Sequence, residues 1–342
     1  PRAVATGGAF AMFDAESSLN PAAVASVLQF TSLLSNAQSF RSSTNPFGSA
    51  SGRDSRFPQA TVLGPIGGTN LAAALSISGY TDRSFAIGTT DSITLRGERV
   101  AVFDTLSATG GLSDLRAALA WQVSPSFHLG AAGHLIPGSN RVLNSRAFSD
   151  TAYAGATELN ELSYLGFGLS TGFVARPVSR VAIAGLVRVD GSLTTRRDST
   201  DLGSIDLPTT LGGAIRWQPS LGLVMAGSVL RRNWSVADAD LKAQGGVGAL
   251  NTTEMAVGLE LIRNNRNPAH KAIRFGAHYA TLPFPVNSGI QPHEYGLSLG
   301  TGLRFTGGRG GFDLALEQLW RSDSEGFSER AFVITLGVSL RP

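Results

Sequence analysis

The feature that most constrains this chain is a strict two-residue alternation of large apolar side chains with small or polar ones. It is clearest near residue 257, where one face carries Met255, Val257, Leu259 and Leu261, and the other carries Glu254, Ala256, Gly258 and Glu260. The same pattern recurs at 181–190, 211–218, 273–279, 295–305, 312–320 and 332–340. A period of two is that of a β-strand whose two faces meet different surroundings.

The length and the second face of these segments favour a membrane barrel over a soluble sandwich. Soluble strands are usually about 5–6 residues long, whereas these segments run for roughly 10–15, as tilted strands that cross a bilayer do. Their second face is rich in Gly, Ala and Ser, which suits a lumen. On this face, Gly258→Ser is expected to impair assembly far less than Leu259→Arg on the lipid face. Only 15% of the residues are charged, against about 25% in soluble domains. We therefore predict an all-β fold, a transmembrane antiparallel β-barrel.

A count of these segments predicts about fourteen strands. They are expected at 27–40, 57–64, 69–80, 112–124, 126–138, 160–175, 178–190, 204–218, 221–236, 249–263, 269–281, 292–306, 310–321 and 328–341. Bacterial single-chain barrels have even strand numbers. A further strand-like segment at 97–107 is therefore assigned to a long excursion between 81 and 111 and not to the wall.

The connections between the segments alternate in length. Short turns are expected at 123–126, 176–179, 218–220, 264–268 and 307–311, and long polar loops at 139–159, 191–204, 236–249, 282–292 and 322–328. This alternation is typical of the periplasmic and outer sides of an outer-membrane barrel.

Composition argues against several other classes of protein. The chain has no cysteine, which excludes disulfides, cysteine metal sites and thiol nucleophiles. The net charge is +3 and the cations are scattered, so no nucleic-acid partner is expected. His128 and His134 lie about 20 Å apart along one predicted strand, too far to share a metal. The other histidines, His270, His278 and His293, lack the spacing of a catalytic triad, so we expect no enzyme and no cofactor.

The first 26 residues lack alternation and are predicted to form a hatch, followed by the barrel at 27–342 with its long outer loops. Asn20 is a good helix cap, and Pro21 suits the first position of a short helical turn that includes Ala22. An apolar segment before the first strand has few places to lie except the lumen. The glycines of Gly300–Gly302 are expected to make room for it there.

The hatch also carries a family resemblance. The chain resembles the FadL-like outer-membrane transporters of long-chain fatty acids and other hydrophobic compounds, and the matching residues are Arg2 and Ala3, Gly7 to Phe10 (Gly7, Gly8, Ala9, Phe10), Asp14, and Asn20, Pro21 and Ala22. Leu112–Trp121 resembles a mid-barrel stretch of the same family. The resemblance implies fourteen strands around an N-terminal hatch. Leu19 replaces the usual aromatic residue before Asn-Pro, and the chain ends in Arg341 and Pro342 where the family has Phe.

The resemblance implies two alternative functions, because the family includes transporters of hydrocarbons and non-transporting partners of secretion machinery. The first is a passive diffusion channel for hydrophobic small molecules such as long-chain fatty acids. The alternative is a plugged scaffold barrel that anchors a surface or secretion complex through its loops. Either protein is expected in the bacterial outer membrane after cleavage of a signal peptide, in contact with membrane lipids and lipopolysaccharide.

Two groups of residues are candidates for the site. Charges on the predicted inward faces would brace the barrel, hold the hatch or bind an anionic head group; they are Arg188, Arg216, Glu254, Glu260, Arg274, Arg304, Asp313, Glu317 and Arg341. Apolar residues of the outer connections are candidates for a ligand pocket; they are Phe85, Ile87, Phe103, Phe148 and Tyr153.

Overall fold

The computed structural model describes residues 1–45, 48–197, 200–243, 245–262, 271–286, 289–305 and 308–341. The predicted turn at 264–268 and His270 lie outside the described residues. The strands are β1 (Thr31–Asn45), β2 (Gly48–Pro65), β3 (Leu71–Asp82), β4 (Phe85–Leu95), β5 (Glu98–Ser124), β6 (Phe127–Phe148), β7 (Ala156–Val178), β8 (Val181–Asp190), β9 (Ser192–Arg197), β10 (Thr200–Asp206), β11 (Thr210–Ser220), β12 (Leu223–Arg232), β13 (Thr252–Ile262), β14 (Lys271–Thr281), β15 (His293–Phe305), β16 (Gly310–Ser322) and β17 (Ser328–Leu340).

The described helices are short: α1 (Arg2–Ala5), η1 (Pro21–Ser26), η2 (Trp234–Ala237) and α2 (Asp238–Ala243). No helix among the described residues is long and apolar enough to cross a membrane.

The strands form one closed antiparallel barrel. Each wall strand pairs with the next along the chain, and β17 pairs back onto β1 through a continuous register from Ser32 opposite Leu340 to Thr44 opposite Ser328. Of the seventeen described strands, β4 and β9 extend the pairing of β5 and β7 beyond the wall and β10 pairs with β9, which leaves fourteen in the closed wall. The prediction of fourteen strands is confirmed. The segment 97–107 is the distal part of β5 and no separate wall strand.

The outer connections differ from the prediction. The polar segment 139–159 is mostly strand, because β6 continues to Phe148 and β7 begins at Ala156. Likewise, 191–204 forms most of the hairpin of β9 and β10. Outside the membrane both faces of a strand meet water, so these strands carry no apolar alternation by which the sequence could reveal them.

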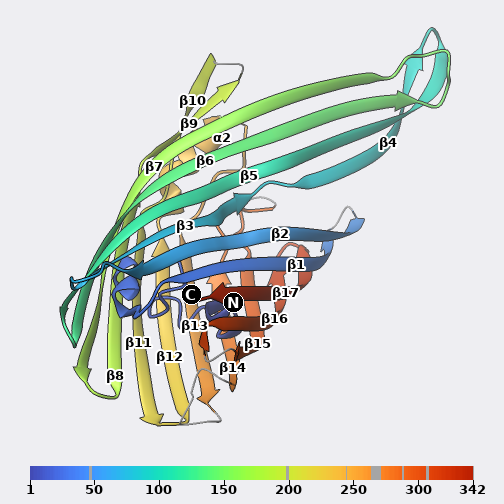
Figure 1. Cartoon of the computed structure of the whole chain (residues 1–342). Coiled ribbons are helices and arrows are strands. Elements are labelled where there is room, and N and C mark those ends of the chain that lie inside the picture. The colour runs from blue at the N-terminus through green and yellow to red at the C-terminus, as the bar shows by residue number, and fades with distance from the viewer. Residues whose placement is uncertain are drawn as a thin grey trace.

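Four of these strands build an arm. In Figure 1 the distal parts of β4, β5, β6 and β7 sweep away from the rest of the barrel. β5 has 27 residues whereas β8 has 10, and a bilayer needs only about 9–11. The distal half of β5, which pairs with β4, therefore lies beyond the membrane thickness.

The alternation has the predicted facing. On β13, Val257 is 62% exposed on the outside, while its neighbour Ala256 is buried inside. Large apolar side chains are likewise exposed on the outer side of the neighbouring strands, for example Ile215, Val229 and Leu297. A continuous apolar outer surface of this extent needs a nonaqueous cover, which a bilayer provides.

The facing predicts a depth-dependent effect of charge. Val257→Arg places a cation in the middle of the outer face and should destabilise the barrel by about 2–4 kcal/mol, whereas Thr253→Arg, on the same face near the strand end, should cost about 0–1 kcal/mol. Reversible unfolding in lipid vesicles measures the difference. Equal costs would show that this face does not meet lipid.

Candidate functional site: the lumen and its N-terminal segment

The N-terminal segment, residues 1–26, lies inside the barrel and contacts opposite walls. α1 packs against β14, β15 and β16, while η1 packs against β2, β3, β5, β6 and β7. The coil drawn in dark blue in Figure 1 is this segment. Phe10 packs with Val224, Ala226 and Ala256 of the wall, and Met12 packs with Leu186 and its neighbours.

Glycines of the wall allow the segment to approach the strands closely. A Cβ at Gly130 would lie 2.4 Å from the Ala22 nitrogen, and one at Gly276 would lie 2.1 Å from the Thr6 carbonyl carbon. Gly300 meets Ala5 in the same way, as the sequence predicts for a wall glycine. At Gly258 the expectation of tolerance is wrong: a Cβ there would lie 2.6 Å from the Thr6 oxygen. The inward face is therefore a contact surface for the segment.

The segment also needs glycine in its own backbone. Gly7 and Gly8 have φ of 62° and 93°, the left-handed region that other residues rarely adopt. Together they turn the chain directly after α1, and Gly7 lies against the backbone of Ala277.

Asn20 ties the segment together. Its Oδ1 accepts from the Ala22 amide at 3.0 Å and caps η1, with Pro21 at the first position. Its Nδ2 donates to the Met12 carbonyl at 3.0 Å and to the Phe173 carbonyl of β7 at 3.2 Å. One buried amide thus joins both halves of the segment and the wall.

A chain of ion pairs joins α1 to the wall. The Arg2 guanidinium lies 2.9 Å from Glu260, Glu260 lies 2.7 Å from Arg274, and Arg274 lies 2.7 Å from Asp313. Arg304 ends the chain, 3.1 Å from Asp313. Because the carboxylates are buried, removal of one partner would leave an unpaired charge inside the barrel.

A second link lies further along the segment. Arg341 donates to Glu16 at 3.0 Å. Burial, together with the nearby Asp14 carboxylate, raises the pKa of Glu16 above its ordinary value despite the nearby arginines. The segment is thus linked by charge to β13 through Glu260 and to the residue that follows β17, Arg341.

The remaining predicted charges also face inward. Arg188 contacts Asp114 at 2.6 Å and Asp190 at 2.8 Å, and the Arg216 guanidinium lies 5.1 Å from the Phe13 ring centroid. Glu254 lies 3.3 Å from Arg232. Glu317 occupies an inward position of β16 opposite Ser298. The structure therefore gathers Glu260, Arg274, Asp313 and Arg304 around α1, places Glu317 near the amino terminus of Pro1, and leaves Arg188 and Glu254 elsewhere in the lumen.

A cavity of about 540 Å³ lies between the segment and the outer connections. Its floor is Ser17, Ser18 and Leu19. Trp234 and Phe284, whose rings meet edge to face at 5.3 Å, line it from the outer connections. Its walls carry polar and ionisable groups: Tyr80, Asp114, Arg188, Asp190, Arg232, Glu254, His278 and Glu294. The cavity thus combines an aromatic side with a charged interior.

Three strands contribute a hydrogen-bond chain that the sequence analysis missed. Asp114 of β5 contacts His134 Nδ1 at 2.8 Å, and His134 Nε2 contacts the Ser170 hydroxyl of β7 at 2.8 Å. The order resembles a catalytic triad, yet all three side chains are buried and Ser170 does not line the lumen cavity. Arg188 also binds Asp114. The arrangement is that of a structural network, and only the strand register reveals it.

The buried Arg116 guanidinium has hydrogen-bond donors without a partner among the described residues. It is 3% exposed and lies one inward position from Asp114 on β5. Within the described part of the chain its Nε and Nη2 have no hydrogen-bond partner, and neither has Nη2 of Arg188 or the hydroxyl of Ser76. Buried cations with unsatisfied donors are costly unless water or an anion completes them.

The five predicted pocket residues do not share one surface. Ile87 pairs with Leu106, whereas Phe103 pairs with Thr90, so Phe103 lies on the opposite face of the arm from Phe85 and Ile87. Phe148 stacks against Tyr153 at 5.6 Å on the face of Ile87. The prediction is corrected for Phe103, and ligand binding by the other four stays a prediction.

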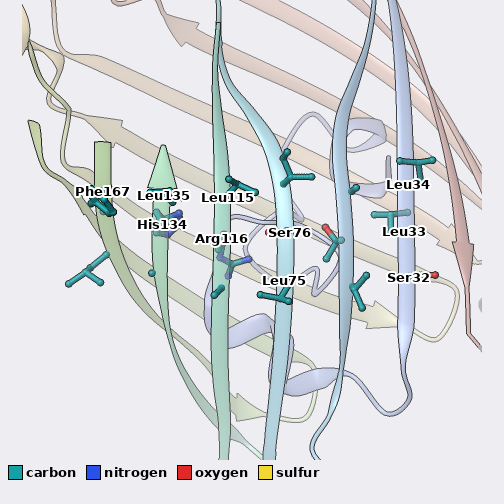
Figure 2. Close-up of a pocket in the computed structure, with 18 of the residues that line it drawn as sticks. Ser32, Leu33, Leu34, Leu75, Ser76, Leu115, Arg116, His134, Leu135 and Phe167 are labelled. Carbon is teal, nitrogen blue, oxygen red and sulfur yellow. The ribbon is translucent and has the colours of Figure 1, made fainter. Parts of the chain in front are cut away.

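A second cavity, of about 1380 Å³, lies on the outer surface across β1, β2, β3, β5, β6 and β7. Figure 2 shows its lining, in which Leu75, Leu115 and Phe167 belong to the exposed outer face. Ser76, Arg116 and His134 alternate with them along the same strands and are buried. This hollow is part of the lipid-facing wall and is separate from the lumen.

The fold of the chain is similar to that of several solved outer-membrane channels. No family model matches the chain, and no curated protein matches its sequence. Among solved structures it is similar to a FadL homologue of Pseudomonas aeruginosa (TM-score 0.69, 14% identity, 99% of this chain and 97% of that one). It is also similar to the CymD monoaromatic hydrocarbon channel (0.62, 14%, 100% and 97%) and to the Pseudomonas putida toluene transporter TodX (0.62, 13%, 99% and 97%). The chain thus has the fold of the FadL-like fourteen-stranded barrels.

Proposed function

We propose that the chain is an outer-membrane passage for hydrophobic molecules that carry a polar head, and that its N-terminal segment holds the passage closed. The observation that carries this proposal is the lumen cavity, which has aromatic residues at the outer connections and residues 17–19 of the segment as its floor. A molecule entering from outside would meet the aromatic side first and the charged walls next. The likeness in fold to hydrocarbon channels supports the same function.

The charged lining favours an amphiphile over a plain hydrocarbon. A hydrocarbon offers nothing to Arg188, Arg232 or the other ionisable groups of the walls, whereas a carboxylate accepts hydrogen bonds from guanidinium groups. Arg188 lines the cavity and keeps an unpartnered Nη2 among the described residues, and Arg232 lines it as a second guanidinium. Long-chain fatty acids have this chemistry, and we propose them as the substrate class.

Binding of a fatty acid and of toluene to purified variants tests the proposal. Arg232→Gln, which removes a guanidinium that lines the cavity, should weaken fatty-acid binding by about tenfold or more, because a hydrogen bond to a charged group contributes about 1.5–3 kcal/mol. Toluene binding should not change. Arg141→Gln, an exposed arginine of the arm, serves as the control and should leave both unchanged. Equal fatty-acid affinity of the wild type and Arg232→Gln would show that this arginine does not bind the ligand. No binding of either ligand would contradict the proposed passage itself.

The arm supports a second candidate, a scaffold that binds another protein. Its strand β4 pairs along its whole length with β5, and among the described residues no second strand has a register with it, which leaves one row of its backbone groups for another strand. Such a scaffold would need the arm and no ligand. Failure of ligand binding together with retained surface assembly would favour it.

A further inference from the structure

The outer surface of the barrel carries two arginines that the lumen network does not use. Arg53 of β2 pairs with Phe40 of β1, and Arg330 of β17 pairs with Trp320 of β16. Directly paired residues share a face of the sheet, and Phe40 and Trp320 are exposed on the outer face. Both guanidinium groups therefore point away from the lumen.

The two arginines lie near each other. Arg53 and Arg330 belong to the strands on either side of β1, at the levels of Phe40 and Ser42. Two strand spacings separate them by about 10 Å across the sheet, and two residues separate them by about 7 Å along it. Arginine side chains are long enough for both groups to reach the same lipid head group.

Aromatic residues mark the depth of this patch. Phe40 pairs with Phe332, and Tyr295 pairs with Trp320, which gives an aromatic row on four neighbouring strands. Such rows lie at the membrane interface, where an outward charge costs little. The arginines adjoin this row at the end from which the arm leaves the barrel, which is the external end in the proposed outer-membrane orientation.

Among the described residues, no carboxylate forms an ion pair with the two arginines of the patch. In the described part of the chain, neither Arg53 nor Arg330 has a hydrogen-bond or ion-pair partner. The carboxylates of these strands, Asp54 and Glu329 among them, occupy inward positions opposite Ser39 and Arg321. An unopposed pair of cations at the head-group level fits an anionic lipid.

We infer that Arg53 and Arg330, with the aromatic side chains of Phe40 and Trp320, bind the phosphates of an outer-leaflet glycolipid. The guanidinium groups bind phosphate through charge-assisted hydrogen bonds. The aromatic rings lie where the head group meets the acyl chains. The inference rests on the proposed outer-membrane location and is independent of what crosses the lumen.

Native mass spectrometry of the purified full chain with diphosphoryl lipid A tests the site. Replacing both residues, Arg53→Gln and Arg330→Gln, should weaken binding by about 30-fold, because each cation near a charged lipid surface contributes about 1 kcal/mol. Arg231→Gln is the matched control: Arg231 faces outward beside Leu211, alone and on a distant strand. It should leave the affinity within about twofold.

A folding control and two control lipids accompany the double variant. Heat-modifiable gel migration shows whether the double variant is folded; if it is not, the Arg53→Lys and Arg330→Lys pair replaces it and should retain most of the binding. Dephosphorylated lipid A should bind the wild type as weakly as the double Gln variant binds the diphosphoryl form. Equal binding of both lipid A forms, an equal loss in Arg231→Gln, or equal affinity for phosphatidylglycerol would overturn the site. Loss of ligand passage with intact lipid A binding would count only against the proposed function.

Discussion

Deletion of residues 1–26 is expected to leave a folded barrel that is much more permeable than the full chain. The wall closes through β1 and β17 without any strand from the segment, so every ladder remains complete. The segment occupies the lumen from the contacts of α1 on β15 to those of η1 on β6. Its removal should raise solute flux by at least about an order of magnitude, since a barrel of this size encloses more space than its own side chains fill.

Flux of small solutes into liposomes measures this effect. The full chain in the same liposomes is the reference, and heat-modifiable migration reports folding. Deletion also removes Arg2 from Glu260, but Arg274 remains 2.7 Å from that carboxylate, so Glu260 keeps a cation as its partner. Unchanged flux through a folded truncated barrel would show that the segment does not close the passage. A truncated chain that fails to fold would assign residues 1–26 to the folding of the wall.

The wall was predictable because one local rule governs it. β13 shows its facing in the sequence itself, since Met255, Val257 and Leu259 must meet lipid while Ala256 and Glu260 must not. The closing strand β17 obeys the same rule. Lipid enforces the alternation, and strand length and number follow from it.

The site was less predictable because it depends on register and on contacts between distant segments. Each of Asp114, His134 and Ser170 reads in sequence as an ordinary inward polar residue, and only the pairing of β5, β6 and β7 joins them. Arg116 likewise reads in sequence as an ordinary inward residue, because its unpartnered donors are visible only in the structure. Strands beyond the membrane, such as β4, lose the lipid constraint and with it the alternation.

The glycines of the wall also depend on contacts between distant segments, which the sequence does not show. Small residues on the inward face suggested open space, but a Cβ at Gly258 would meet Thr6. By contrast, Gly213 of β11 lies on the outward face between the exposed Leu211 and Ile215, and a Cβ added there would have nothing within 4 Å. Whether the chain needs a wall glycine therefore depends on the face that the glycine occupies and on which segment approaches it, and the sequence shows only the first of these.

Gly276→Ala is expected to displace the N-terminal segment. The new Cβ would lie 2.1 Å from the Thr6 carbonyl carbon and 2.2 Å from the Gly7 nitrogen. These are backbone atoms, which cannot rotate away as a side chain can. Gly7 is itself against the backbone of Ala277, so the segment can yield only by moving away from β14 as a unit. Overpacking of this kind costs about 1–3 kcal/mol, and it pulls on the nearby link between Arg2 and Glu260.

The displacement can be measured by thiol labelling, because the chain has no cysteine of its own. Thr6→Cys introduces a thiol of similar size at a position that is 0% exposed. Its labelling by a maleimide should be slow in the otherwise unchanged barrel and about tenfold faster with Gly276→Ala, since an opening free energy lowered by about 1.4 kcal/mol raises the open fraction tenfold. Gly213→Ala should leave the rate unchanged. Slow labelling in a folded Gly276→Ala barrel would mean that wall and segment adjust together, and then the close approach at Gly276 would not be what fixes the segment in the lumen.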